Sequence, residues 1–298
     1  MTWGYVTSIL FISLHAMVPL VLTAVGEIIG ETAGLFNIGL EGILLTSAFT
    51  GVLGAKMGGP IVGLLIGMAT GAAISLVFAI ITTYWKGTQM IAGIGINLFA
   101  LGFVAFGLIA LGSPGFQAVP PGGRLPAILT PAGSLSPIIL VALLLPPLAY
   151  LFLKRTRAGL MLKAVGENPE AADVAGINVN LVRLLATTFG GLLAGLAGAY
   201  ISVSWIGSVT KEISAGRGFI ALATVVFSGL NPLLALLGGF VFGFFESVAT
   251  WVQNLPGSKA VPWQFVAMIP YVVTLLVVAG VIGRVRFPKA LGEPYKRE

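Results

Sequence analysis

The stretch IVGLLIGMATGAAISLVFAIITT, residues Ile61–Thr83, contains no charged side chain. A helix that crosses the hydrocarbon core of a bilayer needs about 20 consecutive apolar residues, so this stretch predicts a membrane-spanning helix. Small residues recur here at every fourth position, namely Gly59, Gly63, Gly67, Gly71, Ser75 and Ala79. Small residues at this spacing let a neighbouring helix approach closely, which predicts a tightly packed helical bundle.

Further apolar runs of similar length flank this stretch on both sides. They are Tyr5–Val25, Phe36–Ala55, Met90–Leu111, Ser136–Leu153, Leu181–Val203, Pro232–Val252 and Gln264–Ile282. In lipid, an α-helix satisfies its backbone hydrogen bonds within its own segment. The sequence therefore predicts an all-α fold, a polytopic transmembrane helical bundle that forms a single domain over residues 1–298.

The composition agrees with a membrane environment. Hydrophobic residues make up 57% of the chain and charged residues 9%, whereas soluble domains carry roughly 25% charged residues. The absence of cysteine excludes disulfides and thiolate metal sites, and one histidine, His15, offers little for a metal. The net charge of +6 comes from basic residues that flank the apolar runs, a pattern typical of membrane topology and not of a nucleic-acid surface.

The distribution of Lys and Arg between alternate loops predicts the orientation. One set comprises Lys86, Lys154, Arg155, Arg157, Lys163, Arg183, Arg284, Arg286, Lys289, Lys296 and Arg297. The opposite set comprises Lys56, Arg124, Lys211, Arg217 and Lys259. Because basic loops stay in the cytoplasm, we expect the first set to be cytoplasmic, with the N-terminus outside and the C-terminus inside.

A shorter apolar run, Phe219–Phe227, is too short to cross a bilayer as a helix. Its nine residues would cover about 14 Å of a core near 30 Å thick. The predicted orientation requires a crossing here, so we expect a broken crossing near residues 217–231, with irregular backbone through Ser228–Asn231. Such backbone is tolerated only beside protein or a water-filled cavity, so we expect a pore here and about eight to nine crossings in total.

The longest charged segment, residues 154–183, contains a short helix with signals at both ends. Asn168 can cap the first amides, Pro169 suits the first helical position, and Glu170 complements the positive end of the helix dipole. Gly176 provides a stop. An ordinary amphipathic connector would show the same signals, so this pattern alone indicates a rigid cytoplasmic projection.

Three motifs resemble a known family. The segment AVGENPEAADVAGINV, residues 164–179, resembles the coupling loop of the permease subunits of ribose, branched-chain amino acid and nucleoside ABC importers. GEIIGETAGLFNIGLEG, Gly26–Gly42, is similar to the family's N-terminal signature, and GRGFIALATVVFSGLNP, Gly216–Pro232, to its C-terminal one. The spacing of the two glutamates Glu27 and Glu31 before the FNIGLEG segment most resembles the nucleoside branch, whose members usually work as two different permeases.

This resemblance implies that the short helix docks into a groove on a cytoplasmic ATPase. The coupling residues would be Asn168, Pro169, Glu170, Ala171, Ala172, Asp173 and Gly176. The small side chains of Ala171 and Ala172 would let the helix sit deep in that groove, and Glu170 and Asp173 would meet basic residues at its rim.

The resemblance also implies several partners. The chain has no G-x4-G-K-[ST] phosphate loop, so ATP would be used by a separate ABC ATPase subunit, and the chain itself would need no cofactor. We expect a second permease subunit, either identical or homologous, and an extracytoplasmic substrate-binding lipoprotein in the plasma (inner) membrane of a bacterium. The solute would be small, neutral and polar: a nucleoside first, with a simple sugar or a branched-chain amino acid as alternatives.

Polar residues inside the apolar spans are candidates for a translocation path, because buried polar groups in membranes usually face a cavity or a partner. The candidates are Asn37, Glu41, Asn97, Ser228, Asn231 and Glu246. A structural role is an equal alternative for Glu246, and a bond to a neighbouring helix is the more common role for an asparagine such as Asn97. Glu27 and Glu31 could be solvated at the membrane edge, and His15 is expected to be a satisfied core histidine.

Two other functions compete with an ABC permease. An ion-coupled secondary transporter would show several buried charges and paired broken helices, whereas this sequence indicates few buried charges and one broken crossing. An intramembrane enzyme would need a catalytic set, and the chain has neither H-E-x-x-H nor G-x-S-x-G.

Overall fold

The computed structural model describes residues 2–130, 133–253, 265–266, 268–281 and 286–295. Four of the basic residues from which the orientation is predicted lie outside these ranges, namely Lys259, Arg284, Lys296 and Arg297. So do the two ends of the last predicted span, Gln264 and Ile282. The helices are α1 (Thr2–Thr32), α2 (Leu40–Thr83), α3 (Gln89–Ala110), α4 (Pro137–Arg155), α5 (Arg157–Glu167), α6 (Pro169–Val174), α7 (Val179–Ala199), α8 (Arg217–Ser228), α9 (Pro232–Gln253) and α11 (Ile269–Val281). A π-helical stretch, Tyr200–Ile206, continues α7.

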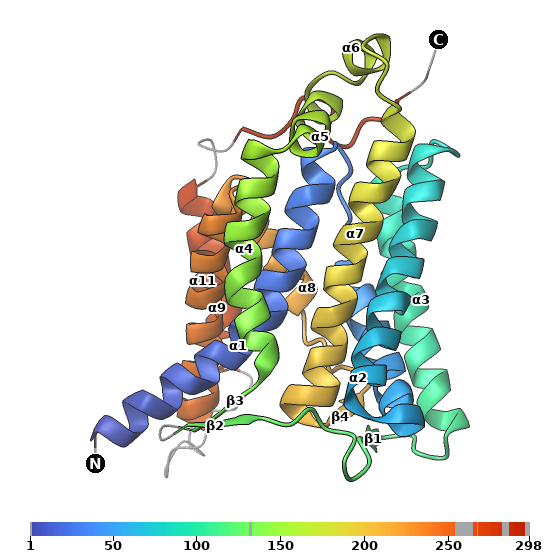
Figure 1. Ribbon diagram of the computed structural model, residues 1–298. Coiled ribbons are helices and arrows are strands. Elements are labelled where there is room, and N and C mark those ends of the chain that lie inside the picture. The colour runs from blue at the N-terminus through green and yellow to red at the C-terminus, as the bar shows by residue number, and fades with distance from the viewer. Residues whose placement is uncertain (1, 131–132, 254–264, 267, 282–285, 296–298) are drawn as a thin grey trace.

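Four short strands accompany the helices. They are β1 (Phe116–Ala118), β2 (Ile128–Thr130), β3 (Gly133–Leu135) and β4 (Ser208–Thr210). β1 pairs with β4 and β2 pairs with β3, both antiparallel. The strands and the N-terminus lie at one end of the bundle, here called the strand end, and α5, α6 and the C-terminus lie at the other, the α6 end (Figure 1).

Six helices are long and apolar enough to cross a membrane in the part of the chain that the structure describes. They are α1, α2, α3, α4, α7 with its π-helical extension, and α9. This confirms the predicted helical, multi-pass architecture. The count of eight to nine crossings stays a prediction, because α8 and the described part of α11 are shorter helices of 12 and 13 residues.

α2 contains two of the predicted spans joined by a sharp reversal. The backbone leaves the helical region at Gly58 and Gly59, and Gly59 has a φ of +84°, which glycine adopts without steric cost. A Cβ placed on Gly63 would lie 2.6 Å from the carbonyl oxygen of Gly51, so the two halves of α2 fold back against each other. The predicted break between Ala55 and Ile61 is confirmed, whereas the first of these helices begins at Leu40 instead of Phe36.

The middle of the predicted small-residue stripe, Gly67, Gly71 and Ser75 on the second half of α2, packs against α7. A Cβ added to Gly71 would lie 2.6 Å from the Cα of Gly195, and one added to Gly67 would lie 3.2 Å from the carbonyl oxygen of Gly195. Gly191 meets Ser75 in the same way. Backbones can approach this closely only where side chains are absent, so the stripe fixes the position of α7 beside α2 (Figure 1).

The irregular part of the broken crossing precedes α8, whereas the sequence predicts it after this helix. Residues 207–216 form a strand and turns, and α8 follows them. The stretch after α8 is only a tight turn, in which Gly229 and Leu230 have positive φ angles of 57° and 61°, and α9 begins at Pro232. The prediction that irregular backbone through Ser228–Asn231 completes the crossing is therefore wrong, because the chain breaks before α8.

Packing of the stripe can be tested by adding bulk at one glycine. We expect Gly71→Leu to lower the free energy of unfolding by about 3 kcal/mol, because its side chain would overlap the backbone of α7. Gly102→Leu is the matched control, since no atom lies within 4 Å of a Cβ at Gly102 on α3. Equal thermal unfolding temperatures of the two purified variants would contradict this packing.

Candidate functional site

The N-terminus of α8 lies inside the bundle and is capped by a carboxylate from another helix. Glu41, in the first turn of α2, accepts hydrogen bonds from the amides of Gly216 and Gly218, each at 2.7 Å. Gly216 is a left-handed residue without a capping side chain of its own, so Glu41 satisfies donors that would otherwise be unpaired. A negative charge at this position also complements the helix dipole of α8.

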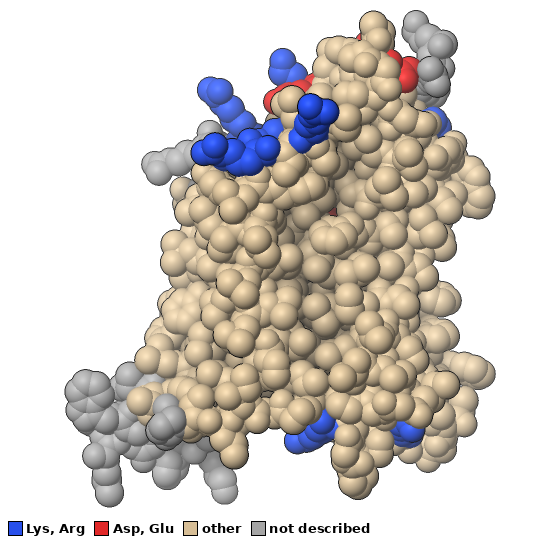
Figure 2. Space-filling model, viewed as in Figure 1, with Lys and Arg blue, Asp and Glu red and all other residues tan. Residues whose placement is uncertain are grey.

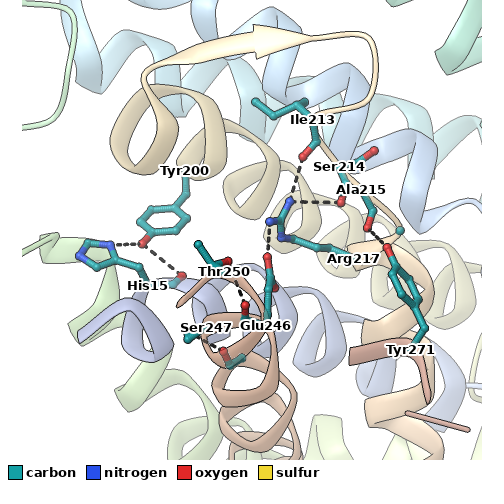
Figure 3. Close-up of polar contacts among 12 residues, drawn as sticks. His15, Tyr200, Ile213, Ser214, Ala215, Arg217, Glu246, Ser247, Thr250 and Tyr271 are labelled. Carbon is teal, nitrogen blue, oxygen red and sulfur yellow. Dashed lines mark hydrogen bonds and ion pairs between the residues drawn. The ribbon is translucent and has the colours of Figure 1, made fainter. Parts of the chain in front are cut away.

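Arg217, the first residue of α8, holds the preceding turn from the other side (Figure 3). Its guanidinium donates to the carbonyl oxygens of Ile213 at 2.9 Å and Ser214 at 3.4 Å. It also forms an ion pair with Glu246 of α9 and lies 4.9 Å from the ring centre of Trp205. These contacts tie the irregular segment to α9 and to the π-helical end of α7.

A third contact comes from α11. The hydroxyl of Tyr271 donates to the carbonyl oxygen of Ala215 at 2.6 Å, and Ala215 itself has a positive φ of 46° (Figure 3). Side chains from α2, α11, α9 and the π-helical stretch after α7 thus contact this turn or Arg217 at its end. The arrangement satisfies backbone groups that lipid could not, which is the condition for irregular structure at membrane depth.

A cavity of about 360 Å³ opens beside this turn. Its polar lining comes from Glu41, Asn97, Lys211, Glu212 and Ser214, and its apolar lining includes Leu45, Leu101 and Phe219. Asn97 lies eight residues into α3, which places the cavity about 12 Å from the start of that helix. The lining therefore combines charged, polar and apolar side chains, and the volume is within the range of small-molecule sites.

Two predicted path residues, Glu41 and Asn97, meet in this cavity. Asn97 also bonds the backbone of the neighbouring α2 region, because its Oδ1 accepts from the amide of Gly42 at 2.8 Å and its Nδ2 donates to the carbonyl oxygen of Ile38 at 3.1 Å. Asn97 thus makes the hydrogen bond to a neighbouring helix that is the more common role of such an asparagine. It also lines the cavity.

The other predicted path residues lie elsewhere. Asn37 is buried, its amide donates to Glu27 at 2.7 Å, and its Oδ1 accepts from Gly39 at 2.9 Å. Ser228 is buried and donates to the carbonyl oxygen of Val225. Asn231 caps α9 and lines a second cavity of about 320 Å³ at the α6 end, together with basic residues such as Lys163. The described residues therefore do not bring all six candidates into one cavity.

The sequence patterns do not identify Arg217, Trp205 or Tyr271 as site residues. Arg217 and Arg183 count as loop charges in the topology prediction, but both are buried. Arg183 donates to the carbonyl oxygens of Ala33, Ala290 and Glu293, at 3.0 to 3.4 Å, and so holds the C-terminal segment against the loop after α1. One feature of the sequence could have indicated the Arg217–Glu246 pair. Arg217 stands at the start of a short apolar helix, and Glu246 lies deep in the next span with no charged residue near it in the sequence.

Glu27 and Glu31 are buried, with 3% and 1% of their surface exposed, and are not solvated at a membrane edge. Together with Arg183 and the Arg217–Glu246 pair, they make buried ionisable side chains more numerous than the sequence indicated. The Nδ1 of His15 lies 2.8 Å from the hydroxyl of Tyr200 (Figure 3). The Nε2 lies 3.0 Å from the carbonyl oxygen of Ser134, so both ring nitrogens have partners, as expected of a satisfied histidine. Among the described residues, no group of three acidic or histidine side chains could hold a metal ion.

The capped helix predicted after Asn168 is present as α6. The Oδ1 of Asn168 accepts from the amide of Ala171 at 2.9 Å, Pro169 is the first residue, and Gly176 follows the end with a φ of +85°. α6 projects from the bundle beyond α5, at the end where most Lys and Arg side chains gather (Figures 1 and 2).

The face that α6 presents differs from the prediction at Ala172. Ala172 is 3% exposed and packs inward with Val165, Val179 and Tyr295, so residues of this chain cover its side chain. Asp173 accepts a hydrogen bond from the hydroxyl of Tyr295 at 2.9 Å. The outward side chains of α6 are Glu170, Ala171 and Val174, and Val174 is 91% exposed although it is apolar.

Comparisons with known proteins agree with this architecture. The family described as the permease component of branched-chain amino acid transport systems matches residues 9–278. The guanosine ABC transporter permease protein NupQ of Bacillus subtilis is 36% identical, over 93% of this chain and 92% of its own length. The nucleoside ABC transporter permease protein NupC of Lactococcus lactis is 34% identical over 93% of each chain.

A third relative is the putative glucose ABC transporter permease protein TsgC13 of Haloferax volcanii, which is 31% identical over 99% of each chain. No solved structure matches the chain. Since the family match covers most of the sequence and the relatives align over nearly their whole length, the chain belongs to the family of permease components of branched-chain amino acid-type transport systems.

Proposed function

We propose that this chain is one permease subunit of a bacterial ABC importer that takes up nucleosides. The main support is the similarity, over more than nine-tenths of the chain, to permeases named for guanosine and for nucleosides. The cavity beside α8 agrees with this proposal, because its hydrogen-bonding groups suit sugar hydroxyls and its exposed Phe219 offers a flat apolar surface to a base. A simple sugar is the second candidate, supported by the glucose permease relative.

The proposed path runs through the cavity lined by Glu41 and Asn97, along the irregular segment before α8. Exposed Lys211 and Glu212 at its rim leave it open toward the surface of the subunit. A second permease, either homologous or identical, would close this side. ATP hydrolysis would belong to a cytoplasmic ATPase, and delivery of the solute to an extracytoplasmic binding lipoprotein.

The proposed topology has eight to nine crossings. The two halves of α2 count separately, and residues 208–228 add a passage that is part irregular and part helix. The α6 end would be cytoplasmic, which places the C-terminus inside and the N-terminus outside. The gathering of Lys and Arg at the α6 end supports this orientation (Figure 2).

The solute path can be tested by filling the cavity. We expect Leu101→Trp to lower the uptake of labelled guanosine at least about tenfold, because the indole would occupy space that the solute needs. Leu98→Trp is the matched control on the same helix, since Leu98 is exposed but does not line the cavity.

Uptake should be measured in cells that also express the partner subunits, with excess inosine or glucose as competitor. Competition by inosine alone supports a nucleoside permease, and competition by glucose alone favours the sugar alternative. If both tryptophan variants transport guanosine at the wild-type rate, the proposed path is wrong.

Contact between α6 and the ATPase can be tested at Val174. We expect Val174→Glu to abolish co-purification of the ATPase with the permease, because it places a charge on the one fully exposed large apolar side chain of α6. Met57→Glu makes the same change at a residue that is 79% exposed beside the break in α2, and it should leave co-purification intact.

Membrane insertion should be normal in both variants. Retention of the ATPase by Val174→Glu at wild-type yield would refute the coupling role of α6. It would also remove one argument for placing the α6 end in the cytoplasm, namely its proposed contact with the ATPase.

A further inference from the structure

An apolar groove lies between α4, α5 and α7, on the face shown in Figure 2 and apart from the solute cavity. Its volume is about 560 Å³, within the range of small-molecule sites, and every one of its lining side chains is apolar. Leu148, Leu185 and Phe189 on its walls are 44 to 61% exposed, and Ile29 of α1 forms part of its floor.

The groove is short and begins at the α6 end. On α4 it runs from Leu145 to Phe152 and on α7 from Val182 to Phe189, so each helix contributes about 10 Å of length. This depth lies within one leaflet of a hydrocarbon core near 30 Å thick. A partner's transmembrane helix would need a groove along the whole core, whereas a single acyl chain needs only this part of it.

Basic side chains stand at the mouth of the groove. The groove-lining positions on α4 are 145, 148, 149 and 152, and the same helical face continues to Arg155. Arg157 begins α5 directly before Ala158, which lines the groove. Both arginines are exposed, and neither forms an ion pair with an acidic side chain in the part of the chain that the structure describes.

We propose that this groove binds an acidic phospholipid of the adjacent leaflet, with one acyl chain between α4 and α7 and its phosphate at Arg155 and Arg157. Guanidinium groups bind phosphate in a bidentate manner, and the apolar walls exclude water from the chain. Basic residues at the end of a helix are common, but here they adjoin a concave apolar site of matching depth. Because α5 leads directly into α6, the bound lipid contacts the support of the projecting helix.

The proposal can be tested by native mass spectrometry of the purified transporter, incubated with equal amounts of phosphatidylglycerol and phosphatidylcholine that carry the same acyl chains. We expect the wild type to retain phosphatidylglycerol at least about tenfold better. The double variant Arg155→Gln/Arg157→Gln should lose this preference. Lys163→Gln is the control, because Lys163 lies at the same end but lines a different cavity.

Filling the groove should have a different effect. Ala158→Trp should reduce retention of both lipids, since Ala158 is exposed and lines the groove, so its replacement is compatible with folding. Leu160→Trp, on the same helix but outside the groove, should bind like the wild type. Retention of phosphatidylglycerol by both the arginine and the Ala158 variants would overturn the proposal. So would efficient cross-linking of a cysteine placed at position 185 to a second permease subunit.

Discussion

The structure depends on the capping of a helix that begins inside the membrane. The irregular segment before α8 exposes amides and carbonyls where lipid offers no partner, and each unpaired group would cost several kcal/mol. Glu41 satisfies two of these amides, while Arg217 satisfies two carbonyls and is itself neutralised by Glu246. Glu41 also lines the cavity beside this segment, so one of the contacts that stabilise the fold lies on the proposed solute path.

Close helix packing places Glu41 where α8 needs it. Gly42 of α2 lies against Asn97 and Ala100 of α3, while the second half of α2 lies against the glycines of α7. Since lipid provides no hydrophobic force between helices, van der Waals contact along these glycines is what brings α2, α3 and α7 together. Glu41 then reaches the amide of Gly218, whose missing side chain leaves room for the backbone of α2.

Much of the fold could be predicted because it follows from local patterns. Apolar length gave the long helices, the Gly59–Ala79 stripe gave a close neighbour, and the Asn168–Gly176 signals gave α6. Contacts between distant residues could not be predicted in this way. Arg217 looks like a loop charge until Glu246, 29 positions later, is seen beside it. Similarly, Ala172 is buried and Val174 is exposed because α6 packs against Val165 and Tyr295. A helix of only six residues is too short for a hydrophobic period that would predict this contact from the sequence.

The most direct measurement of the central claim is the thermal unfolding of Glu41→Leu compared with Glu212→Leu. Both variants remove a carboxylate from the lining of the same cavity, but the side chain of Glu212 is 80% exposed and pairs only weakly with Lys211. If Glu41 caps α8, its loss leaves two amides unpaired, so Glu41→Leu should lose about 3–6 kcal/mol and unfold many degrees below the wild type. Glu212→Leu should unfold near the wild-type temperature. Equal unfolding temperatures for the two variants would contradict the account.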